Sequence, residues 1–290
     1  MKKTKIAILG ANGQIGKALL KDLSKSFEIF PFGKNDCDLS HISSIDRELL
    51  KCSPDIVINC SAYTDVKKAE IDRENCYKLN CINTQNLVDS LKNKKLMLIH
   101  FSTDYIFSNK NKDPVNEENE THPVNYYGTT KLESEKIVRK NLDSFYIFRT
   151  SWVYGDSLKD NFVEFVKKSL LKNKKIQALN SEYSIPTNTG FISKTIEKII
   201  SHSNFYNASG IYNLVPDGYC NRYECARFIE KKLKGDNLNS LININYKSQK
   251  KDVPRPNFSV LSNAKIKDEF KLDVKDWKIY LEEYLRNENK

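Results

Sequence analysis

The chain has 290 residues, of which 39% are hydrophobic and 29% charged, with a formal net charge of +10. This length and composition fit one large domain or two closely associated ones with a sizeable core, and exclude a disordered chain. No apolar run approaches the roughly 18 residues of a membrane span. The run after the basic N-terminus, Ile6 to Leu9, is too short for a signal peptide. We therefore expect a cytoplasmic protein that does not bind membranes.

Cysteines, histidines and lysines exclude further classes. Seven cysteines without a C-x-x-C pair, together with only four histidines, favour reduced thiols and no metal site. The lysines form short, scattered clusters, with no basic stripe interleaved with aromatic residues, so we expect no nucleic-acid binding. The positive field is better suited to attracting an anionic nucleotide ligand.

The first half of the chain alternates strand and helix patterns. Strands are predicted at Lys5–Leu9, Phe27–Phe32, Asp55–Cys60, Leu96–Ser102 and Phe145–Thr150, separated by helices at Ile15–Leu23, Ile42–Leu50, Ala69–Leu91 and around Tyr127–Lys131. Such alternation builds a parallel sheet with helices on both faces, and ligands bind at the carboxyl ends of its strands. Gly10, Thr103 and the residues after Thr150 lie at such ends.

After about residue 155 the alternation lapses. Helix patterns at Asn161–Leu171, Thr189–Ser201, Arg222–Leu233 and Trp277–Leu285 are separated by strand-like runs at Ile211–Val215 and Ile242–Tyr246. We predict an α/β protein with a Rossmann-like, doubly wound parallel sheet in residues 1–155 and a returning piece near 189–215. Residues 156–290 would mainly form a smaller mixed α/β lobe.

A glycine loop, Gly10-Ala-Asn-Gly-Gln-Ile-Gly16, follows the first predicted strand and opens a helix. In this context glycines allow a tight turn, the approach of backbone to a pyrophosphate and close helix packing. The expected dinucleotide contacts in this loop are Gly10, Asn12, Gly13, Gln14, Ile15 and Gly16.

The end of the second predicted strand bears on which cofactor binds. Lys34 stands where NAD-selecting folds carry an acidic residue, and a cation suits a 2′-phosphate, so NADPH is expected in preference to NADH. A solvated surface lysine is the alternative interpretation. Asp38, with its neighbour Leu39, is a further candidate near the adenine.

Tyr127 and Lys131 are four positions apart on a predicted helix, and therefore on one face. An ammonium near a phenol is expected to lower the tyrosine pKa from about 10 toward neutrality, so that the phenol can protonate a carbonyl oxygen. Lys131 would also hold the nicotinamide ribose. A strand-end hydroxyl can donate to the same carbonyl oxygen, and only one of Ser102 and Thr103 can face the cleft. Together with the glycine loop, these residues predict nicotinamide-dependent carbonyl reduction.

The sequence resembles the dTDP-4-dehydrorhamnose reductase family of the extended short-chain dehydrogenase/reductase superfamily nearly end to end. The segments that carry the resemblance are the glycine loop, Pro54–Glu70 (PDIVINCSAYTDVKKAE), Ser102–Phe107 (STDYIF), the Tyr127–Lys131 pair, Arg149–Gly155 (RTSWVYG), Asn161-Phe162, Pro186-Thr187 and Arg255-Pro256. STDYIF and RTSWVYG are much more specific to this group than the glycine loop is.

The resemblance implies roles for individual residues. Thr103, Tyr127 and Lys131 would be the catalytic triad, and Ser61, Ala62 and Tyr63 would line the cofactor channel. Trp152 would pack against the sugar, and Asn161 and Arg255 would contact the nucleotide of the substrate. Tyr105 is a further substrate candidate, with core packing as its alternative. Trp152 could instead fill the seam between the lobes, and Arg255 could cap a loop.

Several positions depart from the family pattern on the substrate side. Lys67 replaces an aspartate of an Asp-Lys-Ala-Glu run, residues 181–184 replace an Asp-Gln-x-Gly run, and Cys60 and Ser61 replace alanines. The sugar therefore stays open, as does the magnesium-bridged homodimer of some members.

We expect NADPH bound by residues 1–155 to reduce the C4 ketone of a nucleotide-linked 4-keto-6-deoxyhexose held by the second lobe. The best match is dTDP-4-dehydro-L-rhamnose reduced to dTDP-L-rhamnose, for polysaccharide biosynthesis. Two alternatives stay open: a related epimerase or reductase acting on a UDP-sugar, and a non-catalytic, NADP-binding regulatory subunit.

Overall fold

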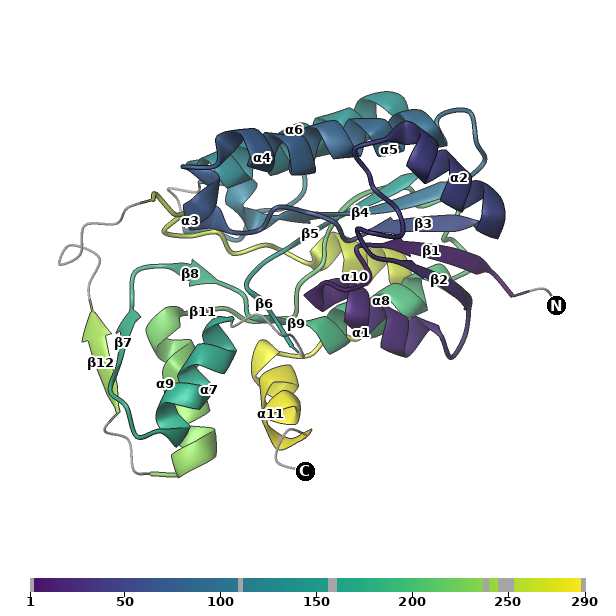
Figure 1. Cartoon of the computed structure of the whole chain (residues 1–290). Helices are drawn as coiled ribbons and strands as arrows, with labels where there is room; N and C mark the ends of the chain where they lie inside the picture. Colours follow the sequence, from purple (N-terminus) through teal and green to yellow (C-terminus); the bar gives the residue numbers. More distant parts are fainter. Residues whose placement is uncertain (1–2, 109–111, 156–160, 237–239, 245–252, 288–290) are drawn as a thin grey trace.

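A six-stranded parallel sheet forms the centre of the computed structural model, which describes residues 3–108, 112–155, 161–236, 240–244 and 253–287 (Figure 1). The strand order is β2-β1-β3-β4-β5-β10. These strands are β1 (Lys5–Leu9), β2 (Glu28–Phe32), β3 (Ile56–Asn59), β4 (Met97–Thr103), β5 (Phe145–Thr150) and β10 (Gly210–Asn213). The chain runs outward from β1 in both directions, which is the doubly wound arrangement, so the predicted α/β fold is confirmed.

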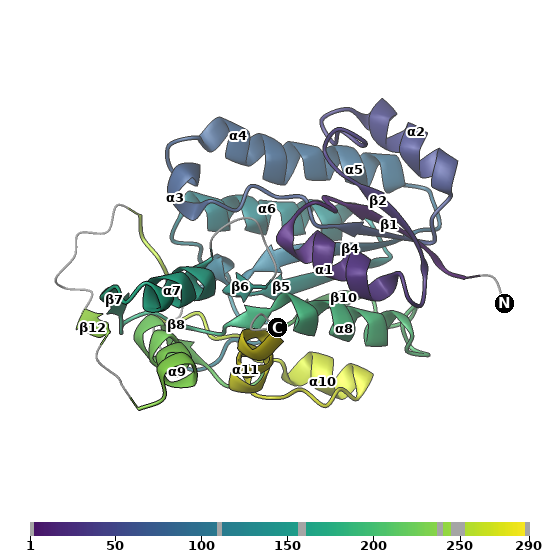
Figure 2. The ribbon, with the colours of Figure 1, turned by 60° about the horizontal axis from the view of Figure 1, so that its bottom comes forward.

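Helices cover both faces of this sheet, as both views of the ribbon show (Figures 1 and 2). One face carries α2 (Ile42–Cys52), α5 (Asn83–Leu91) and α6 (Tyr126–Asn141), and the other carries α1 (Gln14–Leu23), α8 (Thr189–Ile200) and α10 (Ala264–Phe270). Alternate residues of β1 serve the two cores: Ala7 packs with the α2 and α5 side, and Ile8 with the α1 and α8 side. Burial of both faces explains why the strands read as nearly continuous apolar runs.

Most elements after residue 150 that do not pack on the sheet form a second lobe with its own core, which includes Val166, Ile229 and Trp277. Its helices are α7 (Phe162–Leu171), α9 (Arg222–Lys234) and α11 (Trp277–Asn287). Three short strand pairs accompany them: β7 (Ile176–Leu179) with β12 (Leu241–Ile244), β8 (Tyr183–Ser184) with β11 (Cys220–Asn221), and β6 (Val153–Tyr154) with β9 (Thr187–Asn188). Residues 245 and 246 of the strand predicted from Ile242 lie outside the described residues.

The prediction of one continuous helix from Ala69 to Leu91 is wrong. The segment comprises α3 (Val66–Ala69), α4 (Arg73–Tyr77), a π-helical turn η1 (Lys78–Ile82), and α5. The break occurs at Asp72, whose backbone is non-helical and whose carboxylate accepts a hydrogen bond from Asn75 Nδ2 at 2.8 Å. Aspartate favours such helix-start positions because its side chain competes for nearby donors. The fourth strand also ends one residue later than predicted, because Thr103 still pairs with Thr150.

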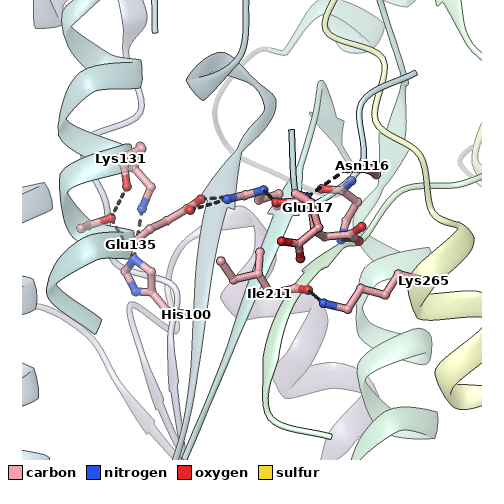
Figure 3. Close-up of polar contacts among 11 residues, drawn as sticks. His100, Asn116, Glu117, Lys131, Glu135, Ile211 and Lys265 are labelled. Atoms are coloured by element: carbon pink, nitrogen blue, oxygen red, sulfur yellow. Dashed lines mark hydrogen bonds and ion pairs between the residues drawn. The ribbon is translucent and has the colours of Figure 1, made fainter. Parts of the chain in front are cut away.

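A buried ion pair connects α6 to the sheet. Arg149 donates to both carboxylate oxygens of Glu135, at 3.0 and 2.8 Å, and its third contact is the carbonyl oxygen of Glu117 at 3.1 Å (Figure 3). The Arg149 and Glu135 side chains are only 3% and 1% exposed. Glu117 in turn accepts from the backbone N–H of Asn213 in β10. The pair therefore joins α6, β5 and β10 through charge-assisted hydrogen bonds.

Arg149→Met should destabilise the protein by about 3–5 kcal/mol, because it leaves the Glu135 carboxylate buried without its partner. Urea unfolding followed by circular dichroism measures the change. Lys267→Met, which removes a half-exposed pair with Asp217, is the matched control and should cost about 1 kcal/mol or less. Equal losses in the two variants would contradict the assignment of Arg149 as a structural cation.

Candidate functional site

The glycine loop connects β1 to α1 at the carboxyl edge of the sheet. Gly10 has a φ of +75°, and the backbone N–H groups of Gly10 and Ala11 both donate to the carbonyl oxygen of Phe32. A Cβ on Gly16 would lie 2.4 Å from the carbonyl oxygen of Gly10, so only glycine lets α1 pack this close to the loop. No side chain caps the start of α1, and its first turn holds no acidic residue. The N–H groups of that turn can therefore serve an anionic ligand.

The other predicted cofactor residues of the first half lie around this loop. The Gln14 amide donates to the carbonyl oxygen of Gly155 at 3.5 Å, and Asn12 lies against Gly33. Lys34 is exposed, which fits both the 2′-phosphate contact and the alternative of a solvated surface lysine. The Asp38 carboxylate accepts from the backbone and hydroxyl of Ser40, which lowers its pKa. Its neighbour Leu39 is buried, and Ile15 packs against the sheet core.

Residues 61–63 follow β3 and lie beside the glycine loop, since a Cβ on Gly10 would come within 2.9 Å of Ser61. The backbone of Tyr63 is held at both of its polar groups by the amide of Asn80, at 2.8 and 3.2 Å. The same amide reaches Thr130 of α6 at 2.9 Å. Asn80 lies in the π-helical turn, a feature that frequently marks functional sites. Sequence patterns did not identify Asn80, because a polar residue in a helix pattern does not reveal that it is buried.

Thr103 and Tyr127 are brought together where β4 ends and α6 begins. The Thr103 hydroxyl accepts from the Tyr105 N–H at 3.2 Å, donates to Asp104 at 3.1 Å and lies near enough to the Tyr127 phenol to affect its pKa. Asn125 caps α6 by accepting from the Gly128 N–H at 2.8 Å. Lys131 follows one helical turn later, and the residue is only 3% exposed.

The pKa of Tyr127 departs from the sequence-based prediction. Burial raises the pKa of this phenol above its ordinary value, and the nearby Thr103 hydroxyl offsets only part of the rise. Burial also lowers the pKa of Lys131 to about 8. The predicted lowering by Lys131 is therefore wrong for this structure, because loss of hydration disfavours the phenolate more than nearby groups favour it.

Asp104 connects the triad to the second lobe. Its carboxylate accepts from the hydroxyls of Ser184 in β8 and Ser259, at 2.8 and 2.5 Å, as well as from Thr103. Burial raises the Asp104 pKa to about 6 in spite of these three donors. A carboxylic acid that titrates near neutrality thus lies directly beside the Thr103 hydroxyl.

A cleft of about 340 Å³ opens between the loop after β3 and the second lobe. Its lining includes three predicted substrate residues, Trp152, Asn161 and Arg255. The Oδ1 of Asn161 caps α7, while its buried Nδ2 has no hydrogen-bond partner among the described residues. Tyr105 joins the cleft to the triad, because its hydroxyl bonds to Arg255 and its ring packs edge-on against Tyr127. Tyr105 is also buried, as its core-packing alternative predicts, while its contact with substrate stays a prediction.

Arg222, at the start of α9, is a cleft residue that the sequence analysis missed. Its guanidinium carbon lies 3.9 Å from the ring centre of Trp152 and 4.5 Å from that of Phe162. Trp152 itself has a φ of +37°, a strained value for a bulky residue. Burial and the neighbouring Arg255 lower the Arg222 pKa. Two guanidinium groups therefore share one cleft, an arrangement that suits an anion.

The described residues contain neither a cluster of metal-ligating side chains nor a membrane-spanning helix. No three His, Cys, Asp or Glu side chains among them lie close enough together to hold a metal ion. In the same ranges, no helix combines the length and apolar character needed to cross a bilayer.

Comparison with known proteins agrees with this arrangement. Residues 4–289 match the family model described as RmlD substrate binding domain. The chain is 28% identical to the spore coat polysaccharide biosynthesis protein SpsK of Bacillus subtilis (strain 168), over 98% of this chain and 97% of that protein. It is 30% identical to a dTDP-4-dehydrorhamnose reductase of Sinorhizobium fredii, over 78% and 77%. The crystal structure of dTDP-4-dehydrorhamnose reductase from Bacillus anthracis str. Ames in complex with NADP superposes with a TM-score of 0.91 at 27% identity, covering 99% of this chain and 100% of that one.

Asp104→Asn tests the raised pKa of Asp104. The folded protein binds this proton more tightly than the unfolded chain, whose pKa is near 3.8, so the wild type should lose stability as pH rises from 4 to 7. Relative to the variant, the loss should be on the order of 2–3 kcal/mol. Urea unfolding at pH 4, 5, 6 and 7 measures it. Asp38→Asn should show the opposite sign, since the Asp38 pKa is lowered. Parallel pH curves for the wild type and Asp104→Asn would refute the raised pKa.

Proposed function

The chain belongs to the RmlD substrate-binding-domain family, and on that premise we propose that it reduces the C4 ketone of a nucleotide-linked 4-keto-6-deoxyhexose with NADPH. The specific reaction proposed is dTDP-4-dehydro-L-rhamnose to dTDP-L-rhamnose. One observation carries it: the neighbouring Thr103 and Tyr127 hydroxyls, with buried Lys131 one turn away, lie at the same sheet edge as the glycine loop. Support comes from relatives named dTDP-4-dehydrorhamnose reductase, one of them solved with NADP.

The residues present fit a dinucleotide. Gly10, Gly13 and Gly16 keep the start of α1 free of side chains, and its N–H groups suit a pyrophosphate. Exposed Lys34 suits a 2′-phosphate, and Lys131 offers ammonium hydrogens to ribose hydroxyls. Bound NADPH would supply the hydride that the ketone carbon accepts.

Tyr127 is in the protonation state that a proton donor needs. Because burial raises its pKa, the phenol stays protonated at neutral pH until the ketone oxygen gains charge. It then donates its proton to that oxygen. Thr103 can donate to the same oxygen by turning its proton away from Asp104, which keeps its bonds from Ser184 and Ser259.

The cleft residues would hold the rest of the substrate. We assign the diphosphate to the two guanidinium groups of Arg222 and Arg255, with the unpaired Nδ2 of Asn161 as a further donor. The ring of Trp152, held by Arg222 on one side, would lie against the sugar.

Tyr127→Phe should lower kcat for a dTDP-4-keto-6-deoxy sugar by roughly 10²- to 10⁴-fold, because it removes the general acid. NADPH consumption, followed at its absorbance maximum, measures the rate. Affinity for NADPH should be nearly unchanged, which separates loss of chemistry from loss of fold. No turnover by the wild type, or full turnover by the variant, would refute the proposed reaction.

Arg222→Met and Arg255→Met should each raise KM for the nucleotide-sugar by about 10- to 100-fold, the range expected for a lost hydrogen bond to a charged group. KM for NADPH should stay constant. Arg286→Met, at an exposed position of α11, is the control and should behave as the wild type does. If instead KM for NADPH rises and KM for the sugar does not, the diphosphate assignment is wrong.

A further inference from the structure

His100 lies in the middle of β4, directly beneath Lys131, and is only 1% exposed (Figure 3). Its Nε2 is 3.5 Å from the Lys131 ammonium nitrogen and 3.1 Å from the Ser134 hydroxyl. Its Nδ1 is 3.2 Å from the side-chain amide nitrogen of Asn59 in β3. The proposed reduction uses Lys131 but gives no role to this imidazole.

The surrounding donors allow only one tautomer for a neutral His100. Asn59 Oδ1 accepts from the backbone N–H of Ser61 at 3.0 Å, so the Asn59 group that faces the imidazole is the NH₂ donor, and Nδ1 must accept. The imidazole proton therefore resides on Nε2. The hydroxyl of Ser134 uses its own proton on the carbonyl oxygen of Lys131 at 2.7 Å, which leaves its oxygen to accept from Nε2.

These bonds form one directed chain from Ser61, through Asn59, His100 and Ser134, to the backbone of Lys131. It joins the predicted cofactor loop after β3 to the first turns of α6. Because Nε2 already carries a proton, the imidazole cannot accept from the Lys131 ammonium, and the 3.5 Å approach is a contact between two donors. The described residues therefore offer the Lys131 ammonium no hydrogen-bond acceptor. Glu135, Cys81 and Cys76 nevertheless lie near enough to affect its pKa.

Protonation of His100 is disfavoured by its surroundings. Burial, and then the charge of Lys131, lower its pKa well below the ordinary value. The imidazole therefore stays neutral and keeps a single tautomer at neutral pH.

We propose that His100 is a positioning residue that fixes the place of the cofactor loop after β3 relative to Lys131. It also leaves the ammonium hydrogens of Lys131 for the ribose hydroxyls of the coenzyme. This inference rests on the proposed NADPH site but on no particular sugar. An imidazole that accepted from Lys131 would compete with the coenzyme for those hydrogens. The fixed tautomer prevents this competition.

Two substitutions separate positioning from bulk packing. In His100→Gln, the side-chain amide can accept from Asn59 and donate to Ser134, whereas in His100→Leu a similar volume carries neither group. Titration calorimetry with NADPH alone, at a temperature where circular dichroism shows each variant folded, should give a Kd raised by roughly 3- to 10-fold in His100→Leu. In His100→Gln the Kd should stay within about twofold of the wild type, because both hydrogen bonds can be kept.

An unchanged Kd in folded His100→Leu, or equal weakening in both variants, would overturn the inference. A wild type that binds NADPH but reduces no dTDP-4-keto sugar would remove the proposed reaction and leave this comparison intact. Long-range ¹H–¹⁵N NMR of the four histidines gives a second check. The neutral Nε2–H form of His100 is expected at pH 6 to 8, and either the Nδ1–H form or the imidazolium would overturn the inference.

Discussion

The close approach of α6 to the end of β4 is the constraint on which the site depends. A Cβ on Gly128 would lie 2.3 Å from the carbonyl oxygen of Tyr105, so the helix reaches this position only because that residue is glycine. This packing places Tyr127 beside Thr103 and brings the Lys131 ammonium nitrogen to 3.5 Å from His100 Nε2. Tyr127 and Lys131, about one helical turn apart in α6, therefore lie next to Thr103 and His100, which are two residues of β4.

This packing buries ionisable groups at the place where the chemistry is proposed. Burial lowers the Lys131 pKa to about 8, raises that of Asp104 to about 6 and raises that of Tyr127. Such shifts cost folding free energy, and those of Lys131 and Asp104 bring both groups toward neutrality, where catalytic groups need to titrate. The Arg149–Glu135 pair and the hydrogen-bond chain through His100 supply partners for some of the other buried polar groups nearby.

The second lobe contacts the site through two consecutive residues that follow Thr103, namely Asp104 and Tyr105. Asp104 accepts from Ser184 and Ser259 of the second half, and Tyr105 bonds to Arg255. The end of β4 therefore fixes the position of the cleft walls relative to the triad. A ligand that bridges the two lobes can be aligned with Tyr127 by the same strand that carries Thr103.

Local patterns in the sequence determined the strand–helix alternation, the place of the glycine loop and the spacing of Tyr127 and Lys131, because each depends on neighbours within a few turns of chain. They could not determine the break at Asp72, the burial of Asn80 and His100, or the stacking of Arg222 on Trp152. They also led to the wrong direction for the Tyr127 pKa. Those properties depend on desolvation and on contacts between residues far apart in the chain, which exist only once the sheet and both lobes have packed.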